Sequence, residues 1–328
     1  MSRRLGVNVM PLEGRREAIV ELATRADELG YEAIFLPETW SYDVAVLLAE
    51  IAIRTERIEL GSSIISVWSR SAASIAMAAS TLQALSAGRF VLGLGASSAE
   101  LTQGLHDRRF DDPAGKLRET ILQVRRLLAG EGPVLATEPD ARAIKLALQS
   151  ELPVPIYAAA LAPSAVRIAG ELCDGWLPFL IPRRELPRHV GMLEERAAAR
   201  PAGRGRARVC PLVPTVLAAS RAEACAGAAW FVAFYLTKMG TIYRRILERW
   251  GFAREVAAVL EANRGRRVGV VPESAEALLE ELTVFGTADE IAPGLESWRA
   301  AGADMPILVL QPGLARLEVE RTLLAALA

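Results

Sequence analysis

Short apolar runs alternate with longer amphipathic segments along most of the chain. Runs such as Leu5–Val9 and Ile58–Ile65 have the length and the content of branched residues that are typical of buried strands. In Gly14–Leu29, apolar residues recur every three or four positions, which predicts a helix, and Gly30 follows as a stop signal. This alternation predicts parallel strands that are connected by helices.

Eight strand-plus-helix units can be followed in this way. Because no Pro- or Ser-rich linker separates them, a closed (β/α)8 TIM barrel of the α/β class is favoured over an open sheet. The predicted strands are Leu5–Val9, Ala33–Leu36, Ile58–Ile65, Phe90–Leu94, Ile156–Ala160, Trp176–Phe179, Val209–Leu217 and Ile307–Leu310. The predicted helices are Gly14–Leu29, Asp43–Arg54, Ser71–Leu85, Asp112–Leu128, Pro163–Cys173, Arg184–Ala199, Ala288–Ala301 and Leu314–Leu327.

The alternation breaks in two places. Residues 130–154 contain short apolar stretches that predict a hairpin insertion, and residues 220–285 predict a helical insertion between strand 7 and the last barrel helices. The whole chain, 1–328, is otherwise expected to form a single barrel domain.

Composition and charge exclude several kinds of partner. The net charge is −1 and the pI is about 6.3, so neither nucleic acid nor an anionic membrane is an expected partner. The N-terminus has only a short apolar run before Pro11, which is neither a signal peptide nor a membrane span, and a cytoplasmic protein is expected. Three widely spaced cysteines with no C-x-x-C pair predict neither a disulfide framework nor a zinc site.

The stretch GRFVLGLGASSAE (Gly88–Glu100) places Gly93 and Gly95 at the end of the fourth predicted strand. A dinucleotide-binding fingerprint needs a third glycine and an acidic residue at the end of the next strand, and both are missing. Two alternatives remain. The glycines allow close packing inside a barrel, or they open a loop on the catalytic face, where βα loops hold cofactor and substrate.

In a barrel, the active-site residues follow the strands. Those positions hold hydroxyls, tryptophans and one carboxylate, Glu38. The only histidines are His106 and His189, and the latter is expected on the surface of a polar helix, so no metal site is predicted. No lysine follows a strand, which argues against Schiff-base chemistry, and there is no G-x-S-x-G motif. Such a set suits an organic cofactor that brings its own chemistry.

Five segments resemble the bacterial luciferase-like superfamily and, within it, the coenzyme F420-dependent oxidoreductases. They are LGSSIIS (Leu60–Ser66), ALSAGRFVLGLGAS (Ala84–Ser97), VPIYAAALAPSAVRIAGELCDGW (Val154–Trp176), MGTIYRRILERWGF (Met239–Phe252) and GTADEIAPGLESWRAAGADMPILVL (Gly286–Leu310). The resemblance covers essentially the whole chain. It implies a (β/α)8 barrel with an insertion, coenzyme F420 as cofactor with FMN as the alternative, and a homodimer or higher homo-oligomer.

The resemblance also implies which residues meet the cofactor. A non-prolyl cis peptide between Ser63 and Ile64 would bulge against the deazaflavin ring, and the Ser66 hydroxyl and Glu38 would lie nearby, although Glu38 can also be a solvated loop carboxylate. Gly95 and Ala96 would face the cofactor. The loop before the fifth barrel helix would hold the cofactor phosphate at a helix N-terminus, and its residues are Leu161, Ala162, Pro163, Ser164 and Ala165.

Candidate catalytic residues follow strands 2 and 4. Similar sugar-phosphate dehydrogenases have an acidic–histidine pair and a glutamate there, and the equivalents here are Thr39 and Ser98. His106 is a further candidate as a proton donor, with a surface loop position as the alternative. Trp40 and Trp68 can wall the substrate pocket or only pack on the barrel top.

These departures disfavour oxidation of a sugar phosphate. A small organic substrate is expected, with hydride delivered from the reduced deazaflavin to an activated C=C or C=N bond. Two alternatives stay open: an FMN-dependent luciferase-like monooxygenase, and an F420- or flavin-binding protein without turnover.

Overall fold

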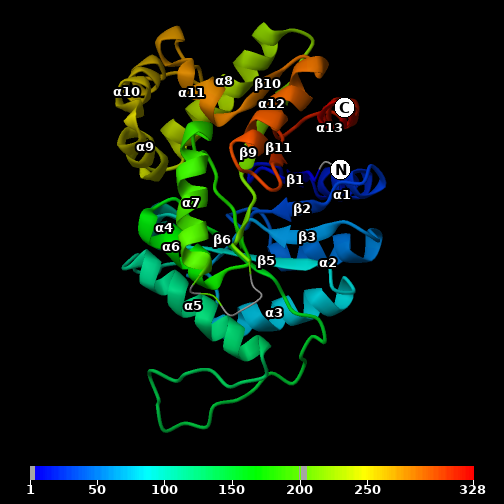
Figure 1. The fold of residues 1–328 in the computed structure, drawn as a ribbon, viewed down its shortest axis with the longest axis vertical. Helices are drawn as coiled ribbons and strands as arrows, with labels where there is room; N and C mark the ends of the chain where they lie inside the picture. The colour runs from blue at the N-terminus through cyan, green and yellow to red at the C-terminus, as the bar shows by residue number, and fades with distance from the viewer. Residues whose placement is uncertain (1–3, 199, 201–204) are drawn as a thin grey trace.

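The computed structural model describes residues 4–198, 200 and 205–328, which form a parallel β-barrel surrounded by helices (Figure 1). Every strand pairing in this part of the chain is parallel. The strands are β1 (Gly6–Asn8), β2 (Ala33–Leu36), β3 (Glu59–Ser62), β4 (Ile65–Ser66), β5 (Phe90–Gly95), β6 (Ile156–Ala159), β7 (Gly175–Trp176), β8 (Arg208–Val209), β9 (Leu212–Leu217), β10 (Val284–Gly286) and β11 (Ile307–Val309).

One bent segment closes the ring of strands. The pairing order is β10-β9-β11-β1-β2-β3-β5-β6-β7-β8, and only Cys210 and Pro211 separate β8 from β9. This segment pairs with β7 at its beginning and with β11 further along. The predicted (β/α)8 barrel is therefore confirmed, with β3 and β4 forming one interrupted strand and β10 adding to the far end of β9.

Helices cover the outside of the barrel and one end of it (Figure 1). Several begin at side-chain caps that the sequence supplies: Asp43 accepts from the Ala45 amide, and Asp112 precedes Pro113 and accepts from the Gly115 amide. The helices are α1 (Arg16–Glu28), α2 (Val44–Arg54), α3 (Ala72–Leu85), α4 (Ala99–Gly104), α5 (Pro113–Leu128), α6 (Pro163–Leu172), α7 (Leu186–Ala197), α8 (Arg221–Lys238), α9 (Ile242–Leu247), α10 (Ala253–Ala262), α11 (Ala277–Leu282), α12 (Ala288–Ala300) and α13 (Arg316–Leu327). Ala199, the predicted end of α7, lies outside the described residues.

Two apolar cores hold these layers together. One lies between the strands and the surrounding helices. The other fills the barrel, where Phe35 and Tyr157 stack, and continues into the helical insertion through residues such as Phe231 and Leu236. The insertion predicted over residues 220–285 is thus helical, and its helices α8 to α11 share their core with the barrel interior.

The predicted hairpin insertion is wrong. Residues 130–154 are all described and contain neither strand nor helix; they form a long irregular excursion between α5 and β6 (Figure 1). Pro133 and Pro139 cannot donate hydrogen bonds to a ladder, and the apolar Ile144 is 78% exposed. Near its start the excursion is held by the Gln123 side chain, which exchanges two hydrogen bonds with the Val134 backbone.

The predicted surface position of His189 is also wrong. Its side chain is 1% exposed and stacks on Trp176, while Nδ1 lies 2.8 Å from the Glu185 carbonyl. Burial lowers the pKa of this imidazole, which favours the neutral form. Trp250 from the insertion packs edge-on against the same ring, so His189 joins α7 to the insertion.

Candidate active site

A β-bulge interrupts the third barrel strand at the C-terminal end of the barrel. Gly61 pairs with Val91 and Ile65 pairs with Leu94, so three residues of one strand oppose two of the other. The Ser63–Ile64 peptide inside this bulge is cis, at the position that the sequence resemblance implied. The Ile64 side chain is half-buried at the top of the barrel interior, so part of its surface remains open to a ligand.

The two glycines of GRFVLGLGASSAE make room for the bulge. A Cβ on Gly93 would lie 1.8 Å from the Ser62 carbonyl oxygen, and a Cβ on Gly95 would lie 2.9 Å from Ile64 Cγ1. The Ser62 hydroxyl replaces the missing ladder contacts: it accepts from the Gly93 amide and donates to the Gly93 carbonyl, both at 2.9 Å. Close packing therefore explains the motif, and the glycines belong to the wall beside Ile64.

Asn8 supports the bulge from β1, and the sequence reasoning missed it. The Ser63 hydroxyl donates to Asn8 Oδ1, and Asn8 Nδ2 donates to the Val9 carbonyl at 2.7 Å. The Asn8 side chain is 3% exposed and lies inside the barrel. A polar residue in the middle of an apolar strand was the available sign of this role.

Glu38 follows β2 and faces Arg70 rather than open solvent. Its side chain is 11% exposed and accepts hydrogen bonds from the Arg70 guanidinium, the Ser69 hydroxyl and the Val44 amide. Arg70 also reaches Asp43 at 2.8 Å. The alternative of a solvated carboxylate is therefore wrong, and contact between Glu38 and a cofactor stays a prediction.

Two further hydroxyls beside Glu38 have no polar partner. Thr39 Oγ1 and the Tyr42 hydroxyl are both buried and unpaired within the described part of the chain. A buried unpaired hydroxyl costs free energy relative to a hydrogen-bonded one, and such atoms in native proteins need an explanation such as water or a ligand. Trp40 lies between Thr39 and Tyr42 in the sequence; its side chain is 46% exposed and free to contact a ligand.

The loop after β5 is held by tryptophan and by a helix cap. Trp68 Nε1 donates to the Ala96 carbonyl at 3.0 Å, and the ring packs on Phe110 with centroids 5.9 Å apart. Ser98 is the N-cap of α4, because its Oγ accepts from the Leu101 amide at 3.3 Å. Ser66 is 3% exposed, and its Oγ accepts from the Trp68 amide. Trp68 thus packs on the barrel top, and its contact with a substrate stays a prediction.

His106 lies just after α4, partly exposed, and no described residue forms a hydrogen bond with its ring. Glu100 on the same helix contacts the insertion, since a Cβ on Gly240 would lie 2.6 Å from the Glu100 carboxyl carbon. The connection between α8 and α9 therefore contacts α4, the short helix that Ser98 precedes and His106 follows.

The loop before α6 presents an uncapped helix N-terminus. Ala162 is the N-cap residue, and among the described residues no side chain caps this end. Pro163 and Ser164 are exposed, and the first backbone bond of the helix runs from the Val166 amide to the Ala162 carbonyl. Free amides at the start of a helix attract anions, so Leu161–Ala165 fits a phosphate, and this contact stays a prediction.

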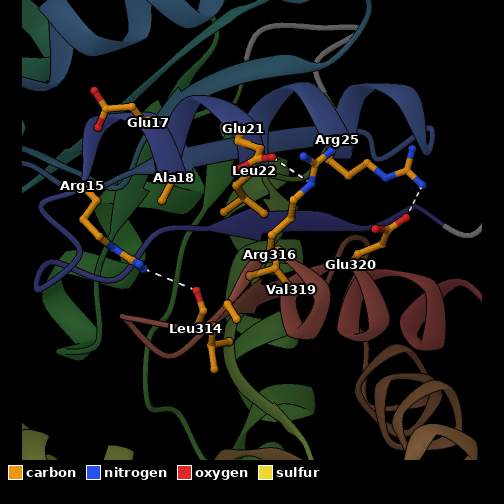
Figure 2. A pocket seen from close by; sticks show the side chains of 11 residues that line it. Arg15, Glu17, Ala18, Glu21, Leu22, Arg25, Leu314, Arg316, Val319 and Glu320 are labelled. Carbon is orange, nitrogen blue, oxygen red and sulfur yellow. Dashed lines mark hydrogen bonds and ion pairs between the residues drawn. The ribbon is translucent and has the colours of Figure 1, made fainter.

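A separate groove lies between α1 and α13 (Figure 2). It encloses about 350 Å³, and ion pairs cross it from Arg25 to Glu320 at 2.6 Å and from Arg316 to Glu21 at 2.9 Å. These charges satisfy each other, and the groove is a seam between the first and last helices. The strand ends, with their unpaired hydroxyls and the bulge, define the candidate site better than this seam does.

Within residues 4–198, 200 and 205–328, no three His, Cys, Asp or Glu side chains lie close enough together to hold a metal ion. No helix in the same ranges is both long and apolar enough to cross a membrane.

The chain belongs to the luciferase-like monooxygenase family, whose model matches residues 4–305. A "Putative coenzyme F420-dependent oxidoreductase" of Mycobacterium tuberculosis is 32% identical over 314 residues, which cover 88% of this chain and 89% of the relative. An F420-dependent glucose-6-phosphate dehydrogenase of Microbacterium testaceum is 29% identical over 172 residues, or 48% of this chain and 51% of the relative. The solved coenzyme F420-dependent tetrahydromethanopterin reductase of Methanopyrus kandleri superposes with a TM-score of 0.81 at 21% identity, over 99% of this chain and 98% of that one, and shares the fold.

Proposed function

We propose that this protein is an F420-dependent oxidoreductase that transfers a hydride between the deazaflavin and a small organic substrate, by reduction of an activated C=C or C=N bond. The observation that carries the proposal is the bulge at Ser63–Ile64, which leaves part of Ile64 open at the mouth of the barrel beside the glycine wall. Membership of the luciferase-like family and the F420-dependent relative at 32% identity support the choice of cofactor.

The residues fit such a cofactor in two places. The bulge offers the half-buried Ile64 as an apolar support for a ring, and Asn8 holds the bulge in position through Ser63. The uncapped start of α6, within Leu161–Ala165, offers amides to a phosphate. When bound, coenzyme F420 supplies the hydride, and the protein contributes orientation and an apolar surround.

The residues near the site fit a reductase better than a sugar-phosphate dehydrogenase. Thr39 and Ser98 offer hydroxyls rather than an acid–base pair, and the Ser98 hydroxyl already caps α4. His106 keeps an unpartnered ring within the described residues and remains the candidate for moving a proton. The monooxygenase alternative with FMN has less support, because the 32%-identical relative is named for coenzyme F420.

A cytoplasmic homodimer is part of the same proposal. The outer faces of α2 and α3, which contact each other, expose Val46, Ile53 and Met77 by 71%, 72% and 52%. Exposed apolar side chains on neighbouring helices are one sign of a protein interface. Light scattering coupled to gel filtration measures the mass, and a monomer at micromolar concentration would contradict the dimer.

A paired binding titration tests the cofactor. We expect coenzyme F420 to bind more tightly than FMN, with each followed by its own absorbance band. Ser164→Glu adds a negative charge at the second position of α6 and weakens F420 binding by about tenfold, because it repels the phosphate. Ala222→Glu places the same charge at the equivalent exposed position of α8 and leaves binding unchanged. Equal effects of the two variants, or no binding of F420 by the wild type, would reject the proposal.

A further inference from the structure

Tyr235 and Tyr243 bring two phenol hydroxyls from the helical insertion to the top of the barrel. Their ring centroids lie 5.4 Å apart with planes at 88°. Both rings also meet Phe179 edge-on, at 4.6 Å for Tyr235 and 5.8 Å for Tyr243. The three rings thus form one aromatic cluster, called here the aromatic wall.

Phe179 places the aromatic wall at the mouth beside the bulge. It forms a bridge to Leu212 after the end of β7, so the strand direction continues to this residue. Leu177, two residues earlier, comes within 3.3 Å of a Cβ built on Gly93. Alternate residues of a strand face the same side. Phe179 therefore lies on the same side as Leu177 but two residues nearer the C-terminal end of the barrel, just as Gly95 lies two residues beyond Gly93.

The same apolar cluster connects the wall to the candidate site. Ile64 of the bulge, Ala159 of β6, Phe179 and Tyr243 all pack, half-buried, against the core that fills the barrel. The wall and the bulge therefore belong to the same open end of the barrel. None of these contacts involves Thr39, Ser98 or His106.

Neither hydroxyl has a polar partner among the described residues. Tyr235 is 4% exposed, and yet its hydroxyl forms no hydrogen bond there. Tyr243 is half-buried, its hydroxyl also forms no hydrogen bond there, and neither oxygen is closed off from solvent. By contrast, the buried Tyr31 hydroxyl donates to the Leu323 carbonyl at 2.8 Å. The two hydroxyls of the wall are therefore open donors in an apolar surround, where a ligand can accept from both.

Burial also keeps both groups protonated. It raises the pKa of the Tyr235 and Tyr243 hydroxyls above the usual value for tyrosine. Two neutral donors in an aromatic surround suit an acceptor oxygen attached to a planar, apolar body.

We propose that Tyr235 and Tyr243 are substrate-binding residues whose hydroxyls donate hydrogen bonds to the carbonyl oxygen of an α,β-unsaturated carbonyl substrate, with the planar body of the substrate against Phe179. The inference rests on the proposed reductase function and narrows its substrate class. The hydride adds two electrons and a hydrogen at the β carbon, and the electron pair of the C=C bond moves toward the carbonyl oxygen. The two hydroxyls stabilise that oxygen as it gains negative charge, and water supplies the proton for the α carbon.

Removal of each hydroxyl tests the proposal. The probes are three enones of increasing size: cyclohex-2-en-1-one, 4-phenylbut-3-en-2-one and chalcone. With reduced F420, Tyr235→Phe and Tyr243→Phe each lower kcat/KM by about 10- to 100-fold, and the double variant lowers it further. The dissociation constant of F420 is unchanged in all three variants. Tyr31→Phe is the control, because it removes a hydroxyl that lies before β2 and donates to the Leu323 carbonyl. This variant leaves kcat/KM as in the wild type.

A spectroscopic measurement does not depend on turnover. Tyrosine labelled with carbon-13 at Cζ reports hydrogen bonding of the hydroxyl, and the two Tyr→Phe variants assign the resonances. Addition of an enone to the F420-loaded protein shifts the Tyr235 and Tyr243 resonances and leaves that of Tyr31 in place. If no enone shifts either resonance, or if the variants reduce enones as fast as the wild type, the proposal is overturned. A protein that binds F420 and shows both resonance shifts but reduces no enone would support the substrate contacts of Tyr235 and Tyr243. The same result would reject the reductase function.

Discussion

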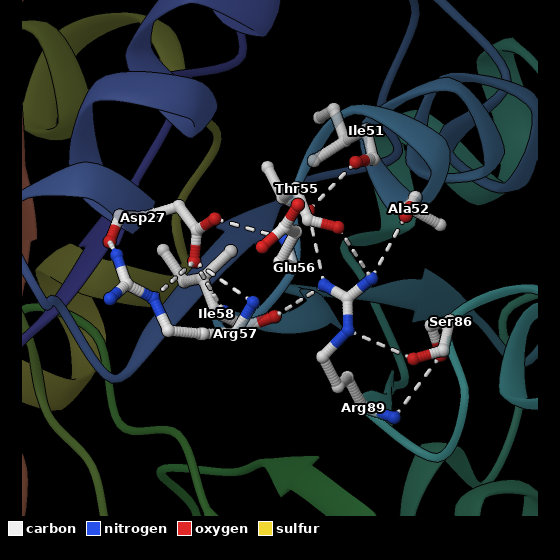
Figure 3. Close-up of polar contacts among 9 residues, drawn as sticks. All are labelled: Asp27, Ile51, Ala52, Thr55, Glu56, Arg57, Ile58, Ser86 and Arg89. Carbon is white, nitrogen blue, oxygen red and sulfur yellow. Dashed lines mark hydrogen bonds and ion pairs between the residues drawn. The ribbon is translucent and has the colours of Figure 1, made fainter.

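The two ends of the barrel differ in how their polar groups are paired. At the N-terminal ends of the strands, the Arg89 guanidinium donates five hydrogen bonds of 2.8–3.0 Å (Figure 3). Beside it, the Asp27 carboxylate accepts from three consecutive backbone amides. The acceptors of Arg89 are the Ser86, Ala52, Thr55 and Ile58 carbonyls and the Thr55 hydroxyl.

At the C-terminal ends, several donors have no partner among the described residues. Thr39 Oγ1 and the Tyr42 hydroxyl are buried and unpaired, and the hydroxyls of the aromatic wall, which solvent can reach, form no hydrogen bond either. The same strands therefore begin at a dense hydrogen-bond network around Arg89 and Asp27 and end beside open donors. The difference is that expected of a barrel enzyme, in which one face stabilises the fold and the other binds the reactants.

The largest expected effect comes from filling the glycine wall. Gly93→Ala forces a methyl group against the Ser62 carbonyl, and the backbone must move, so the free energy of unfolding falls by about 3 kcal/mol or more and cofactor binding is lost. Gly14→Ala, which meets nothing within 4 Å, is the control and leaves both unchanged. Denaturant titration measures the change. A stable Gly93→Ala protein that binds F420 normally would show that the bulge can move freely.

The next effect separates stability from binding. Arg89→Ala removes five hydrogen bonds and leaves their acceptors unpaired, which lowers the free energy of unfolding by about 3 kcal/mol. The folded fraction should bind cofactor normally, because these contacts lie at the opposite end from the bulge. Loss of binding in folded protein would mean that the two ends are coupled. The control is Arg57→Ala, whose side chain is 70% exposed and which should cost much less.

Two carboxylates at the N-terminal end, Glu32 and Glu59, each have one buried oxygen without a hydrogen bond among the described residues. Glu59 Oε2 is buried without a hydrogen bond among the described residues, and burial is the main cause that raises the pKa of this carboxyl. Since the charged form is disfavoured in the folded protein, Glu59 contributes stability at low pH that is lost as the pH rises through its raised pKa. Glu59→Gln should therefore raise the melting temperature at neutral pH relative to the wild type, and the gain should shrink in acid. A variant that melts lower than the wild type at every pH would contradict this assignment.

The smallest effect is expected at the groove between α1 and α13. Arg316 is 77% exposed and pairs with Glu21, so Arg316→Ala should change the free energy of unfolding by about 0.5 kcal/mol or less. The same titration in high salt should remove even that difference. A larger loss would show that the seam contributes to closing the barrel.

The fold was predictable because the strands and helices alternate with clear periods. The weaker predictions failed where local pattern did not decide: residues 130–154 lack a partner strand, and His189 was judged from polar neighbours although Trp176 and Trp250 bury it. At the site, the resemblance located the cis peptide, whereas Asn8 and the aromatic wall were missed. The wall joins β7 to helices that lie some 55 to 65 positions later, and no spacing within one motif reveals such a contact.

The ring of strands also sets the order in which the protein can be completed during synthesis. β1 pairs with β11, so Gly6 has no strand partner on this side until Ile307 has been synthesised. Until that last strand has left the ribosome, β1 and β9 both keep an open edge, and open edges invite pairing with other chains. Translation that stops shortly before residue 307 therefore yields a chain prone to aggregate rather than a smaller working barrel.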